Sequence, residues 1–150
     1  MSLETEVMSL IKDAMKNKDE AMLRGLRAIK AEIIKAKTDP GANGEISADT
    51  ELKLLQKLVK QRKDSLAIYE QQSRPDLAVK ESEEIAIIEK FLPAQMSEED
   101  VKAAVQAIIT ELGASGPQDL GKVMGLATKQ LAGQADGKII SAIAKSLLTA

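Results

Sequence analysis

The residues best suited to chemistry are lysines near the C-terminal end of the chain. Over residues 119–150 the charged side chains are four lysines and two aspartates: Lys122, Lys129, Lys138, Lys145, Asp119 and Asp136. An ammonium group binds phosphate or carboxylate as a compact point charge. This segment therefore predicts a locally basic surface that binds something, rather than a site that catalyses a reaction.

Most catalytic chemistry is excluded by what the chain lacks. It has no histidine and no cysteine, so imidazole bases and thiolate nucleophiles are absent. Zinc loses its usual nitrogen and sulfur ligands. The acidic pairs Glu83-Glu84 and Glu98-Glu99 are adjacent in sequence, and adjacent side chains on a helix diverge by about 100°. We expect no catalytic residue, no metal and no cofactor.

Two segments near these lysines resemble phosphate-binding elements. Residues 116–123 come close to the phosphate-loop pattern, but Val123 stands where a hydroxyl must bind magnesium, and no apolar strand precedes the loop. We interpret that match as accidental. At Asp136-Gly-Lys138, helix N-terminal amides and a lysine could receive one phosphate. The alternative is a helix capped by Asp136, with its amides already satisfied.

A second basic stretch has no acid from residue 52 to residue 63, and its cations are Lys53, Lys57, Lys60, Arg62 and Lys63. The first three share one helical face, so their charges add locally. This face is either simply solvated or binds RNA phosphates by shape. Arg62 interrupts an apolar stripe and is either a buried ion-pair member or a side chain that reaches solvent. With only Tyr69 and Phe91 as aromatics, a base-stacking platform is not expected.

The composition predicts a helical protein. Apolar residues make up 44% and charged residues 29%, as in a folded globular chain, but aromatics are only 1%. A core of Leu, Ile, Val, Ala and Met favours helices over β-sandwiches and barrels. The net charge of −2 gives no overall attraction to nucleic acid or to an anionic membrane. We expect no signal peptide, no membrane-spanning segment and a cytoplasmic location.

Apolar periodicity predicts seven helices. They lie near residues 2–15, 20–37, 47–72, 77–91, 97–112, 120–131 and 136–149, with Ser2, Ser47 and Ser97 as caps. Ile139, Ile140, Ile143 and Leu147 are predicted to form the buried stripe of the last helix. Gly121 and Gly125 are expected to allow close packing inside a helix. The predicted fold is all-α, with a four-helix domain over residues 1–95 and a dissimilar three-helix domain over residues 96–150.

Five short motifs together resemble the GatB/YqeY family. They are Lys60-Gln-Arg-Lys-Asp-Ser65, Glu89-Lys-Phe-Leu-Pro93, Met96-Ser-Glu-Glu99, Asp119-Leu-Gly-Lys-Val123 and Gly133-Gln-Ala-Asp-Gly-Lys138, spread over most of the chain. The resemblance implies two helical domains and kinship with the C-terminal tail of the GatB subunit of tRNA-dependent amidotransferase, which helps to hold tRNA. The matching positions, expected to set the packing and turn of the last two helices, are Gly121, Lys122, Val123, Gly133, Ala135, Asp136, Gly137 and Lys138.

The resemblance carries a family label, carbon–nitrogen ligase with glutamine as amido donor, but nothing in this chain resembles the catalytic domains of that enzyme. The expected function is an RNA-binding accessory module for tRNA or a tRNA-containing complex, with Lys122 and Lys138 as the foremost contacts. The alternative is a protein-interaction adaptor with no nucleic-acid role, using an exposed apolar groove between the domains. A third possibility is that the chain itself has amidotransferase activity, but we expect it to form no amide product.

Overall fold

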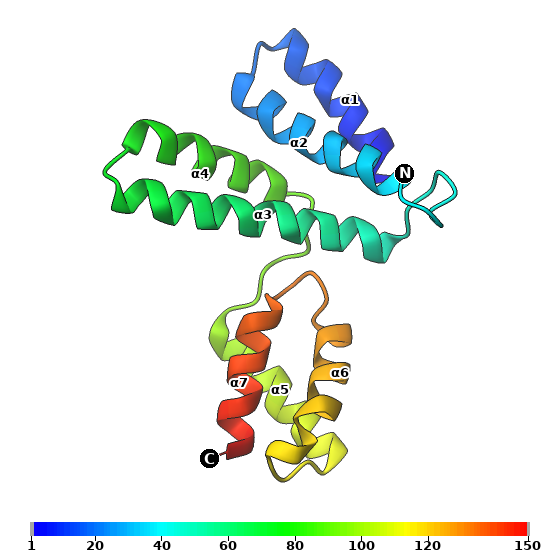
Figure 1. Ribbon diagram of the computed structural model, residues 1–150, viewed down its shortest axis with the longest axis vertical. Coiled ribbons are helices and arrows are strands. Elements are labelled where there is room, and N and C mark those ends of the chain that lie inside the picture. Colours follow the sequence, from blue (N-terminus) through cyan, green and yellow to red (C-terminus); the bar gives the residue numbers. More distant parts are fainter. Residues whose placement is uncertain (1, 150) are drawn as a thin grey trace. The chain divides into compact units, whose positions relative to one another are not determined.

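The computed structural model describes residues 2–149, which form seven α-helices and one short 3-10 helix with no β-strand (Figure 1). The predicted all-α class is confirmed. The elements are α1 Leu3–Lys16, α2 Glu20–Lys37, α3 Ala48–Gln71, α4 Pro75–Glu89, α5 Glu98–Leu112, η1 Pro117–Asp119, α6 Leu120–Gln130 and α7 Gly137–Thr149.

Side-chain caps set the start of several helices. The Ser2, Ser47 and Ser97 hydroxyls accept hydrogen bonds from backbone N–H groups three residues onward, at 3.2, 3.1 and 3.1 Å. These three predicted caps are confirmed. Asp19 caps α2 in the same way, through the N–H of Met22 at 3.1 Å. Gly113 ends α5 in the left-handed conformation, with φ at 65°.

The chain divides into two compact units, Met1–Leu92 and Pro93–Ala150. The first contains α1 to α4 and the second contains α5 to α7 with η1. The division into domains over residues 1–95 and 96–150 remains a prediction.

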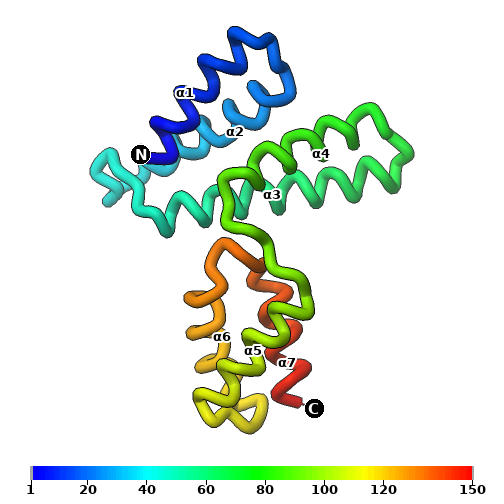
Figure 2. Tube along the Cα trace, turned by 180° about the vertical axis from the view of Figure 1, so that it is seen from behind, coloured from blue at the N-terminus to red at the C-terminus, as the bar shows by residue number. Residues whose placement is uncertain are grey.

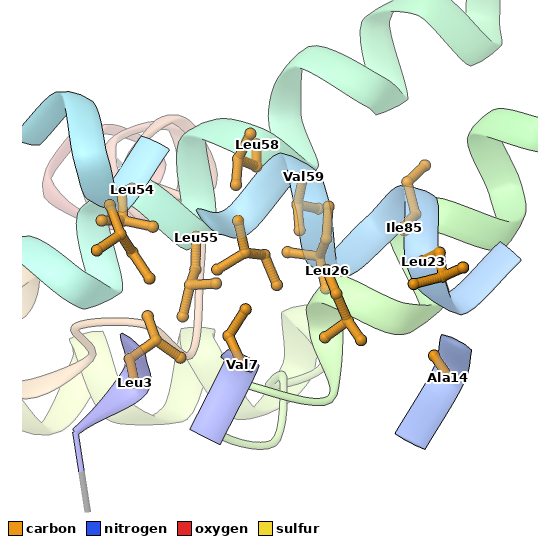
Figure 3. Packing of buried hydrophobic residues seen from close by; sticks show 13 residues of the cluster. Leu3, Val7, Ala14, Leu23, Leu26, Leu54, Leu55, Leu58, Val59 and Ile85 are labelled. Atoms are coloured by element: carbon orange, nitrogen blue, oxygen red, sulfur yellow. The ribbon is translucent and has the colours of Figure 1, made fainter. Parts of the chain in front are cut away.

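In the first unit, α1 pairs with α2 and α3 pairs with α4, while α2 packs against both α3 and α4 (Figure 2). Figure 3 shows the leucine, isoleucine and valine side chains of α1 to α4 meeting in one core. At Gly25 the helices α2 and α4 come close, because a Cβ there would lie 2.7 Å from Cγ2 of Ile87. A glycine is therefore needed at this crossing.

The buried face of α3 is wider than a single apolar stripe. Leu55 and Val59 are buried, and Leu54 and Leu58 are buried as well. The reason is that α3 packs against two helices, α2 and α4, so one row of apolar residues cannot cover both contacts. Phe91, predicted in the fourth helix, lies beyond its end at Glu89.

In the second unit, α5, α6 and α7 surround a core that includes Val101, Val105, Ile108, Val123 and Ile140. The prediction for α7 is wrong in part. Ile140 is buried with Ala144 and Leu148, whereas the side chain of Ile139 is 39% exposed. Ile143 and Leu147, also predicted to be buried, are partly buried and pack against the core.

The predicted close packing at Gly121 and Gly125 is also wrong. A Cβ added at either position would meet no atom within 4 Å. Both glycines are exposed, so neither is required by a helix contact in the second unit.

Candidate functional site

Helix α6 is fixed in orientation by its loop and by its core contacts. The Asp119 carboxylate accepts a hydrogen bond from the N–H of Ser115 at 3.0 Å. The turn η1 then leads directly into α6, which buries Val123 and Ala127. The segment that resembles a phosphate loop therefore follows a helix, not a strand, and its aspartate is already engaged with the backbone.

The opposite side of α6 carries Gly121, Lys122, Gly125 and Lys129, all of them exposed. We name this set the α6 lysine face. With about 100° per residue, Gly125 lies roughly 180° from the midpoint of Val123 and Ala127. Lys122 and Lys129 are seven residues apart and therefore lie almost in line along the helix. The face points directly away from the core.

Two features set the α6 lysine face apart from the rest of α6. First, its glycines leave the helix backbone bare, since nothing lies within 4 Å of a Cβ built there. Second, within residues 2–149 no carboxylate lies within 4.0 Å of Lys122 or Lys129, and α6 itself contains no acid. An anion can approach the helix closely and meet two uncompensated ammonium groups.

Helix α7 adds Lys138 and Lys145, which are also seven residues apart on one side of their helix. Neither pairs with a carboxylate in the described part of the chain. At the start of α7, the Asp136 carboxylate accepts a hydrogen bond from the N–H of Lys138 at 3.0 Å. Asp136 is thus the predicted cap, and it already satisfies one amide that a phosphate would need.

The Gly133–Lys138 motif shapes the turn between α6 and α7. Gly133 has φ at 77°, a conformation that glycine adopts most readily. Its carbonyl accepts a hydrogen bond from Nε2 of Gln95 at 2.7 Å. The next carbonyl, that of Gln134, accepts one from the N–H of Met96 at 2.9 Å. These bonds tie the segment before α5 to the turn. Gln95 was not predicted, because an isolated glutamine in a loop gives no sequence signal.

The cations of α3 are placed differently from those of α6 and α7. Lys57 lies 3.8 Å from the Glu32 carboxylate, and Lys63 lies 3.6 Å from that of Glu89. Lys53 and Lys60 are exposed, with no ion pair among the residues described. Acids from neighbouring helices thus share part of this face, which the sequence of α3 alone does not reveal.

Arg62 forms an internal contact. Its Nε lies 3.5 Å from Oε1 of Glu84, and their side chains are only 17% and 16% exposed. Its Nη1 also donates a hydrogen bond to the Leu58 carbonyl at 3.2 Å. Of the two predicted alternatives, the ion pair is the one observed. Close to this pair, burial raises the pKa of Glu81, and repulsion from Glu84 raises it further, while Arg62 opposes both.

The described residues contain neither a metal-binding cluster nor a membrane-spanning helix. Within residues 2–149 no three acidic side chains come together in a way that could hold a metal ion. None of the helices in the same range is both long and apolar enough to cross a membrane.

Comparison with known proteins supplies a family and two relatives. The family described as "Yqey-like protein" matches residues 4–148. The chain is 35% identical over 107 residues to "Altered inheritance of mitochondria protein 41, mitochondrial" of Clavispora lusitaniae (strain ATCC 42720). The aligned region covers 70% of this chain and 61% of the relative. It is also 32% identical over 132 residues to the protein of the same name from Kluyveromyces lactis. That aligned region covers 87% of this chain and 67% of the relative.

These relatives correct one prediction. Both are mitochondrial by name, so the expectation of a cytoplasmic protein is wrong on this comparison. The matched part of this chain spans about three fifths of one relative and two thirds of the other. Their names state neither an activity nor a ligand.

Proposed function

The chain belongs to the YqeY-like family, and we propose that it is an accessory protein that binds structured RNA, with tRNA as the substrate class. The single observation that carries the proposal is the α6 lysine face. It combines two unpaired lysines with two exposed glycines, although a glycine inside an exposed helix costs about 1 kcal/mol relative to alanine. That cost finds no compensation within the second unit.

Phosphate binding accounts for this combination. Lysines that neutralise phosphates gain affinity by releasing counterions from the nucleic acid. Glycines let the backbone of a helix come closer to a sugar–phosphate chain than any other residue allows. Residues 120–149 contain Lys122, Lys129, Lys138 and Lys145 against Asp136 alone, so the positive field extends over both α6 and α7. Recognition is by shape and charge, because the chain has almost no aromatics for stacking.

No catalytic step is part of this proposal. Without imidazole or thiol, the chain is proposed to present RNA to another component. The purified protein, incubated with glutamine, ATP and mischarged tRNA, is expected to form no amide product.

The test is tRNA binding measured across a salt series. We expect saturable binding at low salt, with log K falling linearly against log salt. Changing Lys122→Glu and Lys129→Glu together should weaken binding and lower the salt slope by roughly one unit per lysine. The matched control changes Lys53→Glu and Lys60→Glu, two exposed lysines of α3 without an ion pair in the described residues.

The control pair carries the same change in total charge, so it separates a local face from a general electrostatic effect. Equal losses for the two double variants would show that the α6 lysine face has no special role. The absence of saturable binding at low salt would remove the RNA proposal as a whole.

A further inference from the structure

A groove lies between α5 and α7, and no residue of the α6 lysine face lines it. It has a volume of about 380 Å³, and its wall on α7 is the apolar row Ile139, Ile143 and Leu147. Glu98 and Lys102 of α5 and Lys138 at the start of α7 also line it. All these residues belong to the second unit.

The core uses the apolar row only in part, since Ile143 and Leu147 pack against it but are only partly buried. Helix α7 already buries Ile140, Ala144 and Leu148, and Ile139 remains 39% exposed. The three side chains of the row are spaced by four residues, so they form a ridge about 12 Å long that is inclined to the helix axis and spans about two helical turns. An amphipathic helix that packs along α7 would present its own apolar residues at the same spacing.

The charges beside the row define the partner further. Lys102 and Lys138 are exposed, and no carboxylate lies within 4.0 Å of either one in residues 2–149. Glu98, the single acid of the groove, leaves both cations available. A helix with glutamates or aspartates beside its apolar row would pair with them.

We propose that the groove between α5 and α7 docks an amphipathic helix of a partner protein, whose apolar residues pack on Ile139, Ile143 and Leu147 and whose acidic residues meet Lys102 and Lys138. RNA does not suit this surface, since its apolar row offers nothing to phosphate. A second copy of the chain is disfavoured, because two helical turns fall short of the roughly 800 Å² that each partner contributes to a stable interface.

The test uses a fluorescently labelled helical peptide of about 18 residues, long enough to form a helix on binding. It carries leucines at positions spaced by four and three residues, and glutamates beside them. Two comparison peptides replace all glutamates by lysines or scramble the sequence. We expect the glutamate peptide to bind the full-length chain saturably below about 1 mM, and to bind more tightly than either comparison peptide.

Two variants locate the binding. Ile143→Asp places a charge in the apolar row and should weaken binding of the glutamate peptide by about tenfold or more. Ile68→Asp is the matched control, because Ile68 is a half-exposed isoleucine of the other unit, and it should leave binding unchanged. Changing Lys102→Glu and Lys138→Glu together should reverse the preference, so that the lysine peptide binds better than the glutamate peptide. Circular dichroism checks that each variant is folded, and the charge-reversed variant tests the groove even where Ile143→Asp unfolds the unit.

Three results would overturn the inference. The first is that the three peptides bind equally well or that none of them binds. The second is that Ile143→Asp and Ile68→Asp weaken binding of the glutamate peptide equally. The third is a stable dimer, detected by sedimentation and dissociated by Ile143→Asp, which would make a second copy the occupant. If the unchanged chain bound the glutamate peptide but showed no saturable binding of tRNA at low salt, the RNA proposal alone would be refuted.

Discussion

The two kinds of glycine in this chain predict opposite effects of the same substitution. Gly125 lies inside α6, where a Cβ would meet nothing within 4 Å. Alanine is favoured over glycine in a helix interior by about 1 kcal/mol, partly because it restricts the unfolded chain. Gly125→Ala should therefore raise the free energy of unfolding of the second unit by about 1 kcal/mol.

Gly25→Ala should do the reverse. The new Cβ would lie 2.7 Å from Cγ2 and 3.1 Å from Cβ of Ile87. Those atoms sit at the branch point of the side chain, so α2 and α4 must move apart. Overpacking of this kind costs about 1–3 kcal/mol, from which the helix preference of about 1 kcal/mol is subtracted. The expected result is a net loss of about 1 kcal/mol in the first unit.

Thermal unfolding can distinguish the two effects. Tyr69 is the single tyrosine and the chain has no tryptophan, so tyrosine fluorescence reports on the first unit, while far-ultraviolet circular dichroism reports on both. For units of this size, 1 kcal/mol corresponds to about 4–8 °C in Tm. Gly125→Ala should raise the Tm of an unfolding transition seen by circular dichroism. Gly25→Ala should lower the Tm of the transition seen by tyrosine fluorescence. A destabilising Gly125→Ala would mean that α6 is packed against something, and the binding role inferred from its bare backbone would lose its basis.

Three further predictions follow from single contacts. Gly125→Leu should weaken tRNA binding without destabilising the fold, because the leucine side chain fills the space that a phosphate backbone would use. The salt series measures the binding and circular dichroism measures the stability. Unchanged tRNA binding would show that close approach to the helix backbone is not needed. Arg62→Ala should cost about 1–2 kcal/mol of unfolding free energy, measured in urea, since it leaves the half-buried Glu84 carboxylate unpaired; a neutral effect would show that the ion pair is not stabilising. Glu81→Gln should raise the free energy of unfolding at pH 7 but not below about pH 4. The pKa of Glu81 is raised above its ordinary value of 4.5 in the folded protein, so ionising Glu81 costs stability as the pH rises from 4.5 through the raised pKa. If Glu81→Gln also raised the free energy of unfolding at low pH, the effect would have another cause.

Local sequence signals predicted the elements of this fold well. Serine caps act through hydrogen bonds within a few residues, and such effects are visible in a single segment. The helical class followed from a composition almost free of aromatics. These features need no knowledge of which helices meet.

The choice among faces could not be predicted in the same way. In α7, Ile139, Ile140, Ile143 and Leu147 all fit a helical period, and only the packing against α5 and α6 decides which are buried. The period alone does not separate Ile140, which is fully buried, from Ile143 and Leu147, which are only partly buried. The ion pair of Arg62 with Glu84 likewise depends on the partner helix α4, which the sequence of α3 does not contain.

The distribution of ion pairs, rather than their energy, favours α6 over α3 as the proposed RNA contact. Exposed pairs such as that of Lys57 with Glu32, at 3.8 Å, are worth about 0–1 kcal/mol, so a phosphate could displace the carboxylate at little cost. The carboxylate itself would remain, however, beside the incoming phosphate and repel it. On α6 no acid is present to be displaced. If the charge reversals on α3 nevertheless weakened tRNA binding as much as those on α6, local repulsion would not decide the contact, and overall charge would.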